Sequence, residues 1–158
     1  MKNNKAMLQT QTPLPSSAYS MPGNHFNRSE QRIKEIICEE VNKVELMAYH
    51  YGKGIPLICT PENILTKKRD IEYKTARFLI ALFLIYLRGF STVDAGKAIG
   101  RDHATVINAR KKINDYVDTD QAIRKLITSI FDRFSMSDSE RIEFLILLSE
   151  KDLRLKSK

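Results

Sequence analysis

The sequence predicts an all-α protein built around a helix-turn-helix, and three observations lead to this fold class. Apolar residues recur at steps of three and four along most of the chain, the spacing of one face of an α-helix. Alternation of apolar and polar residues, the mark of a half-buried strand, is not convincing in any segment. Two helical segments flank a tight turn at Gly100 and Arg101, which is typical of a helix-turn-helix.

The chain divides into three parts. Residues 1–28 are polar and interrupted by prolines, a composition that cannot offset the entropy of ordering, so we expect a disordered tail. Residues 29–117 predict a helical domain that holds the helix-turn-helix at 91–117. Residues 118–158 predict a C-terminal helical extension.

The first helix is expected to begin at Asn27, with Glu30 three residues later as in a capping box, and to end at Gly52. Its apolar face holds Ile33, Ile36, Ile37, Val41, Val44 and Ala48.

Thr60 and Pro61 predict the start of a short helix that ends before Lys67. A long central helix follows from Tyr73 to Leu87. Its apolar run begins at Phe78 and is too short to span a bilayer, so we expect a core helix and no membrane anchor.

The helix-turn-helix begins with a short helix after Ser91 that has a small residue at its centre. Asp102 then caps a longer helix that ends near Val117. Three- and four-residue steps predict a buried stripe on this helix, made of Val106, Ala109, Ile113 and Tyr116 or Val117.

Two more helices are expected near the C-terminus. The first starts at Asp118 or Thr119, and the second starts with a capping box of Ser137 and Glu140. Their large apolar surface needs a partner, which is either this domain or another subunit. A homodimer or protein partner held through residues 119–154 is therefore one hypothesis, motivated by Phe131, Phe134, Phe144 and Leu148.

The charge balance favours polyanionic partners. Lysine and arginine number 26 against 19 acidic residues, for a net charge of +7. Charge alone leaves nucleic acid and acidic membranes as alternatives.

The cysteines indicate a reducing compartment. Cys38 and Cys59 are far apart and neither belongs to a C-x-x-C pair, so we expect buried thiols and neither a disulfide nor a zinc site. The N-terminus has no apolar stretch after Lys2 and Lys5, and we expect no secretory signal. These features predict a cytoplasmic, nucleoid-associated protein.

The polar face of the helix that starts at Asp102 is the first candidate site. It carries no acidic residue between His103 and Lys112, whereas a merely solvated face, the alternative, usually mixes both signs. Histidine, threonine and asparagine can bond to base edges, and lysine suits phosphates. The candidate residues are His103, Thr105, Asn108, Lys111 and Lys112.

A basic cluster precedes the central helix and forms the second candidate site. Lys67, Lys68 and Arg69 are followed by Lys74 and Arg77 in the first turns of the helix. Because cations oppose the dipole at a helix N-terminus, a nearby phosphate would explain them.

The turn and the start of the helix that follows it resemble a known family. Residues 100–113, GRDHATVINARKKI, resemble the signature of the DNA-binding domain of the bacterial replication initiator DnaA. The matching residues are Arg101, Asp102, His103, Thr105, Val106, Ala109, Lys112 and Ile113. The basic cluster and Arg77 are similar to the same family, so the resemblance covers roughly residues 40–117. It implies a DnaA C-terminal-domain-like or Trp-repressor-like bundle, here with two extra C-terminal helices.

The resemblance also implies roles. Arg69 would enter the minor groove and Arg77 would hold a phosphate or base, while His103 and Thr105 would read the major groove. Asp102 would either accept a hydrogen bond from cytosine or only cap the helix. Lys68 and Lys112 would contact phosphates, and Arg101 is also expected among the DNA contacts. The bound partner would be double-stranded DNA with a DnaA-box-like site.

Three departures from the family pattern shift the expected target. Only Gly100 precedes Arg101, where the family usually has two glycines. Ala104 replaces a threonine, and Phe78 replaces a glutamine after Arg77.

The sequence contains no G-x-x-x-x-G-K-[ST] loop, so we expect no bound nucleotide, no cofactor and no ATPase activity. A role in origin recognition or its regulation is the family-based expectation, with a phage or mobile element as one setting for it.

The sequence argues against catalysis and RNA binding, and it leaves protein interaction open. His25, His50 and His103 have no suitably spaced partner for a metal site, and adjacent Asp102 is a poor orienter of His103, so we expect no enzyme. RNA binding is less favoured, because recognition of single strands normally uses aromatic residues for stacking, and the basic residues here have none interleaved with them. A protein-interaction module, or a transcriptional regulator with drifted specificity, stays open as an alternative.

Overall fold

The computed structural model describes residues 28–44 and 58–150, and within these ranges it is helical with no strand. The elements are α2 (Glu30–Lys43), a 3-10 turn η3 (Asn63–Leu65), α3 (Ile71–Arg88), α4 (Thr92–Ala98), α5 (His103–Thr119), α6 (Gln121–Arg133) and α7 (Asp138–Ser149). The all-α fold class is confirmed. The tail predicted at 1–28 lies, except for Arg28, outside the described residues.

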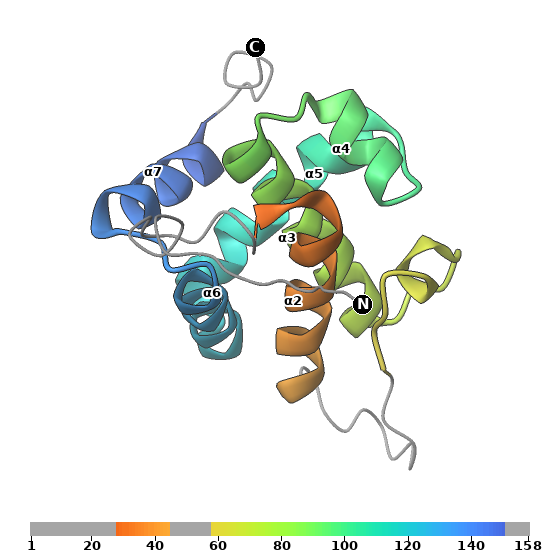
Figure 1. The fold of residues 1–158 in the computed structure, drawn as a ribbon, viewed down its shortest axis with the longest axis horizontal. Coiled ribbons are helices and arrows are strands. Elements are labelled where there is room, and N and C mark those ends of the chain that lie inside the picture. Colours follow the sequence, from red (N-terminus) through yellow and green to blue (C-terminus); the bar gives the residue numbers. More distant parts are fainter. Residues whose placement is uncertain (1–27, 45–57, 151–158) are drawn as a thin grey trace, which may run out of the picture.

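The α3 helix forms the middle of the structure. It is buried along most of its length, from Tyr73 to Ile85 apart from Lys74. Figure 1 shows α2 packed along it, with α6 and α7 on one side and α4 on the other. The domain therefore surrounds one apolar helix, and the surfaces of the outer helices are left for other roles.

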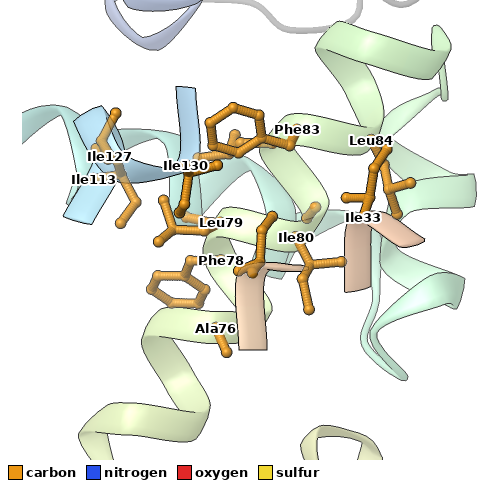
Figure 2. Close-up of a cluster of buried hydrophobic side chains, with 14 of the residues drawn as sticks. Ile33, Ala76, Phe78, Leu79, Ile80, Phe83, Leu84, Ile113, Ile127 and Ile130 are labelled. Atoms are coloured by element: carbon orange, nitrogen blue, oxygen red, sulfur yellow. The ribbon is translucent and has the colours of Figure 1, made fainter. Parts of the chain in front are cut away.

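One hydrophobic core joins all of these helices. Figure 2 shows Ile33 from α2, Phe83 from α3, Ile113 from α5 and Ile130 from α6 in the same cluster. Burying such side chains contributes about 1.5–3 kcal/mol each relative to leaving them exposed. The described chain thus folds around a continuous core.

The helices that we expected to form an extension are part of this core. Phe144 of α7 stacks on Phe83 of α3, with ring centroids 4.2 Å apart, and meets Phe131 of α6 edge-on. Phe131, Phe134, Phe144 and Leu148 are at most 5% exposed. These four residues find their partners within the chain, so they no longer motivate a dimer.

Both ends of the first helix differ from the prediction. Ser29, not Asn27, caps α2 by accepting a hydrogen bond from the Arg32 backbone N–H. The helix ends at Lys43, where Val44 is extended, instead of continuing toward Gly52. The side chain of Asn42 bonds both backbone polar groups of Cys59, at 2.7 and 3.0 Å, so a distant segment is fixed against the last turn. Ala48 and Gly52 lie outside the described residues.

The other boundaries differ by one or two residues. Asp120 caps α6, where Asp118 or Thr119 was expected, because its side chain accepts from the N–H groups of Ala122 and Ile123. The capping box of Ser137 and Glu140 at α7 is confirmed.

Candidate nucleic-acid interface

The connection between α4 and α5 is a tight turn, and two positions in and beside it favour glycine. Gly100 has φ +70°, in the left-handed region that glycine adopts at low cost. The Arg101 backbone N–H donates to the Gly96 carbonyl at 2.8 Å. A Cβ on Gly96 would lie 2.7 Å from the Arg101 carbonyl oxygen, so only glycine allows the turn to approach α4 this closely.

The N-terminus of α5 is fixed by Asp102. One carboxylate oxygen accepts from the Thr105 backbone N–H at 3.0 Å and from the Thr105 hydroxyl at 2.9 Å. These two hydrogen bonds, the backbone one first, lower the pKa of Asp102 below its ordinary value. The capping role is thus present, whereas the cytosine contact implied by the resemblance stays a prediction. His103 follows with its side chain exposed.

The two faces of α5 lie as the periodicity predicted. Val106, Ala109 and Ile113 are fully buried. The polar face is outward: Thr105 is half-buried, and the side chains of His103, Asn108, Lys111 and Lys112 are exposed. At 1.5 Å per residue, Lys111 lies about 12 Å along the axis from His103, so the lysines form the far end of this face.

The basic loop, defined as residues 66–70, follows a short turn rather than an α-helix. Thr60 and Asn63 exchange two hydrogen bonds between side chain and backbone, at 2.8 and 3.1 Å, which starts η3. Lys67, Lys68 and Arg69 then lie exposed. Figure 1 shows this segment, in yellow, beside the first turns of α3.

Arg77 corrects an expectation. The residue is only 3% exposed, and its side chain points inward to the basic loop instead of outward to a phosphate. Its guanidinium donates to the carbonyls of Ile64 at 2.6 Å, Thr66 at 2.9 Å and Lys68 at 2.7 Å. Burial, and next the charge of Arg101, lower the pKa of Arg77. Lys74, one turn earlier, is exposed as expected.

Arg101 connects the basic loop to the turn before α5. Its guanidinium donates to the Thr66 carbonyl at 2.8 Å and to the Gly100 carbonyl at 2.9 Å. Gly100 itself lies against Leu65, since a Cβ there would be 3.5 Å from the Leu65 side chain. The two segments that the sequence singled out, 67–69 and 101–105, are therefore neighbours.

A shallow hollow lies where α4 ends, along the turn and the start of α5, and it adds a residue that the sequence reasoning missed. Its lining consists of Lys97, Gly100, Arg101, Asp102 and Thr105. Lys97 is exposed in the last turn of α4. Its position three residues before Gly100 was a usable signal, because the last turn of the first helix must lie close to the turn that follows.

Arg110 was also missed, and its role is structural. It sits between the buried Ala109 and the exposed Lys111, is 7% exposed, and donates to the Leu148 carbonyl. This contact joins α5 to α7. The α5 helix thus presents lysines outward while an arginine on its inner side fixes it to the bundle.

The described residues contain neither a metal-site cluster nor a membrane-spanning helix. Within 28–44 and 58–150, histidine, cysteine, aspartate and glutamate side chains form no group of three suited to hold a metal ion. Among the described helices, none combines the length and apolar character needed to cross a membrane.

Fold and site together define an all-α domain in which a basic loop lies against the turn between two short-connected helices. Over 70 residues the chain is 39% identical to the chromosomal replication initiator protein DnaA of Thermodesulfovibrio yellowstonii. The match covers 44% of this chain and 16% of that protein, so the chain corresponds to a small part of its relative. The chain contains a DnaA-like domain. No family profile and no solved structure matches it.

Proposed function

We propose that this chain binds double-stranded DNA in a sequence-dependent manner. The exposed face of α5 would enter the major groove at its His103 end, in the geometry of a helix-turn-helix. The basic loop would contact the backbone and the minor groove on the same side. The observation that carries the proposal is the Arg101 contact to Thr66, since it holds the two cation-bearing segments together.

The exposed residues have the chemistry for such a role. His103 and Asn108 offer donors and acceptors for base edges, and lysines suit phosphates. The Thr105 hydroxyl already donates to Asp102, so it would act on DNA as an acceptor or through its methyl group. We place Lys67, Lys68, Arg69 and Lys74 among the phosphate and minor-groove contacts, and Lys97 beside them.

A binding role is also favoured over catalysis by the bonds of Asp102. Its carboxylate is engaged by Thr105 and is not the partner of the adjacent His103 ring. A catalytic pair needs the acid to orient the imidazole. The expectation that the protein is not an enzyme therefore remains part of this proposal.

Fluorescence anisotropy on labelled duplexes tests the function. We expect a duplex with a consensus DnaA box to bind roughly a thousandfold more tightly than a scrambled duplex at near-physiological salt. A logarithmic plot of affinity against salt should be linear, with a slope that reports the phosphate contacts. Weak binding to both duplexes with the same slope would refute sequence dependence and leave only a general DNA-binding role.

Matched variants locate the site in the same assay. His103→Ala should reduce the preference for the box, and Lys68→Ala should weaken binding to both duplexes and lower the salt slope by about one. Lys125→Ala is the charge-matched control, because Lys125 is an exposed lysine on α6, outside the proposed contacts. Equal losses in Lys68→Ala and Lys125→Ala would contradict the proposed site.

The biological setting that we propose is replication initiation or its regulation. It rests on the similarity of this chain to a chromosomal replication initiator protein. If this is correct, the purified chain should displace a DnaA protein from a DnaA-box duplex in a competition experiment. Simultaneous binding of both proteins to a single box would contradict direct competition.

A second candidate function, contact with a protein, is favoured by α7. Ile142, Leu145 and Ile146 are 58%, 40% and 49% exposed and lie at three- and four-residue steps on one helix face. A homodimer through this face would replace the one expected from the buried phenylalanines. Light scattering at micromolar concentration tests the homodimer, and a monomeric mass would exclude the homodimer at that concentration.

A further inference from the structure

Two arginines from separate parts of the fold meet at one backbone oxygen. The Thr66 carbonyl accepts a hydrogen bond from Arg77 at 2.9 Å and from Arg101 at 2.8 Å. Arg77 comes from the buried start of α3, and Arg101 comes from the turn before α5. One carbonyl of the basic loop is therefore bonded both to α3 and to the turn before α5.

The loop depends on these side chains for its shape. Arg77 also donates to the carbonyls of Ile64 and Lys68, so its guanidinium spans the backbone of residues 64–68. The other bonds to this stretch are local and uncharged. The backbone N–H groups of residues 64–66 donate to nearby carbonyls at 3.2 Å, the Thr66 hydroxyl donates to the Asn63 carbonyl at 2.7 Å, and the Lys68 N–H donates to the Thr66 hydroxyl at 3.4 Å. Hydrogen bonds from charged donors are about twice as strong as neutral ones. Among the described residues, the arginines thus supply the charged hydrogen bonds that tie this stretch to distant parts of the chain.

This arrangement leaves positive charge in place. A carbonyl satisfies the donors of a guanidinium without cancelling its charge, unlike a carboxylate. Burial, and next the charge of Arg101, lower the pKa of Arg77, and the second effect is expected when two cations are held close together. The exposed Lys67, Lys68 and Arg69 add to the same region.

We propose that Arg77 and Arg101 are positioning residues that set the basic loop at a fixed distance from the N-terminus of α5. With the loop held there, Arg69 reaches the DNA at the same time as His103. Without the two arginines the loop stays basic, but Arg69 no longer contributes to binding. This inference rests on the proposed DNA binding.

A double-mutant cycle tests the proposal on the full chain, with the DnaA-box duplex as the probe. Arg69→Ala is measured alone and in the Arg101→Lys background, which keeps the charge and loses the paired geometry. We expect Arg69→Ala to weaken binding by about tenfold in the wild type. In the Arg101→Lys background the same change should cost less than about threefold.

His103→Ala provides the control for this cycle, since its contribution should be the same in both backgrounds. Arg77→Lys gives a second background, and Arg101→Lys carries the test alone if Arg77→Lys fails to fold, because Arg101 lies at the surface. A merely structural role of the two arginines would reduce the Arg69 and His103 effects alike.

The outcomes separate the two proposals. Equal losses from Arg69→Ala in both backgrounds, or no loss in the wild type, would overturn the positioning role while leaving DNA binding intact. A wild type that binds neither duplex would overturn the proposed function and this inference with it. Loss of the Arg69 effect with the His103 effect retained would support both.

Discussion

Replacing Gly96 with alanine tests the packing on which the proposed interface depends. Gly96 is buried in α4, and the turn that leads into α5 passes directly over it. By helix propensity alone, alanine should stabilise this position by about 1 kcal/mol. The structure predicts the opposite sign.

The magnitude follows from the backbone atoms above Gly96. A Cβ would lie 2.7 Å from the Arg101 carbonyl oxygen and 3.0 Å from the Asp102 carbonyl oxygen, and neither can turn away as a flexible side chain could. Overpacking of this kind costs about 1–3 kcal/mol. The 2.8 Å bond from Arg101 to the Gly96 carbonyl would also weaken, at about 1 kcal/mol. Subtracting the propensity gain leaves a net loss of about 1–3 kcal/mol.

Urea unfolding followed by circular dichroism measures this loss, together with thermal melting. We expect Gly96→Ala to lower the melting temperature by about 4–12 °C, whereas Lys97→Ala, at the exposed neighbouring position, changes the free energy of unfolding by less than about 0.5 kcal/mol. DNA affinity should fall with Gly96→Ala, because the turn would move away from the basic loop. An unchanged or increased melting temperature would refute the reasoning.

Three other predictions address the rest of the fold. Phe144→Ala should cost about 3–5 kcal/mol in one cooperative transition, against less than about 1 kcal/mol for the exposed Leu145→Ala; similar values for the two would show that α7 is an appendage. The hydrogen bond from Arg28 lowers the pKa of Glu140, so its stabilisation is complete above the ordinary value of 4.5 and is lost as pH falls through the lowered pKa. The stability difference between wild type and Glu140→Gln, which keeps the capping box, should therefore shrink below pH 4.5 in acid titrations, and a constant difference would contradict the ion pair. Asp102→Ala should lower the melting temperature and Asp102→Asn should not, because asparagine caps helices equally well; equal effects would argue against the cap.

Local signals in the sequence were sufficient for the helix starts and for the faces of α5. A cap such as Asp102 or Ser137 acts within its own first turn, so short-range patterns predict it. The end of α2 was different. It is fixed by the contact of Asn42 with Cys59, seventeen positions later, and no local pattern carries such information.

The candidate site was predicted in part for a similar reason. Exposure on α5 follows from periodicity, whereas basic residues near the start of α3 were all assigned to DNA from their charge. Arg77 lies four residues after Tyr73 and seven before Leu84, at the spacing of the buried stripe, and this signal could have separated it from the exposed Lys74. The bonds to Thr66 join residues far apart in the chain, so only the folded structure reveals them.

The arginines of this fold donate to two kinds of acceptor, carboxylates and backbone carbonyls, and the choice of acceptor bears on function. Arg28 pairs with the carboxylate of Glu140, and Arg133 pairs with that of Glu40. At the candidate interface, Arg77 and Arg101 instead donate to backbone carbonyls. Carboxylate pairs neutralise charge locally, whereas carbonyl partners satisfy the donors and leave the field in place. Arg77 and Arg101 thus hold a loop in place while keeping their charge. If the chain binds DNA as proposed, the exposed lysines and Arg69 at this interface would speed encounter with DNA and orient the α5 face toward it.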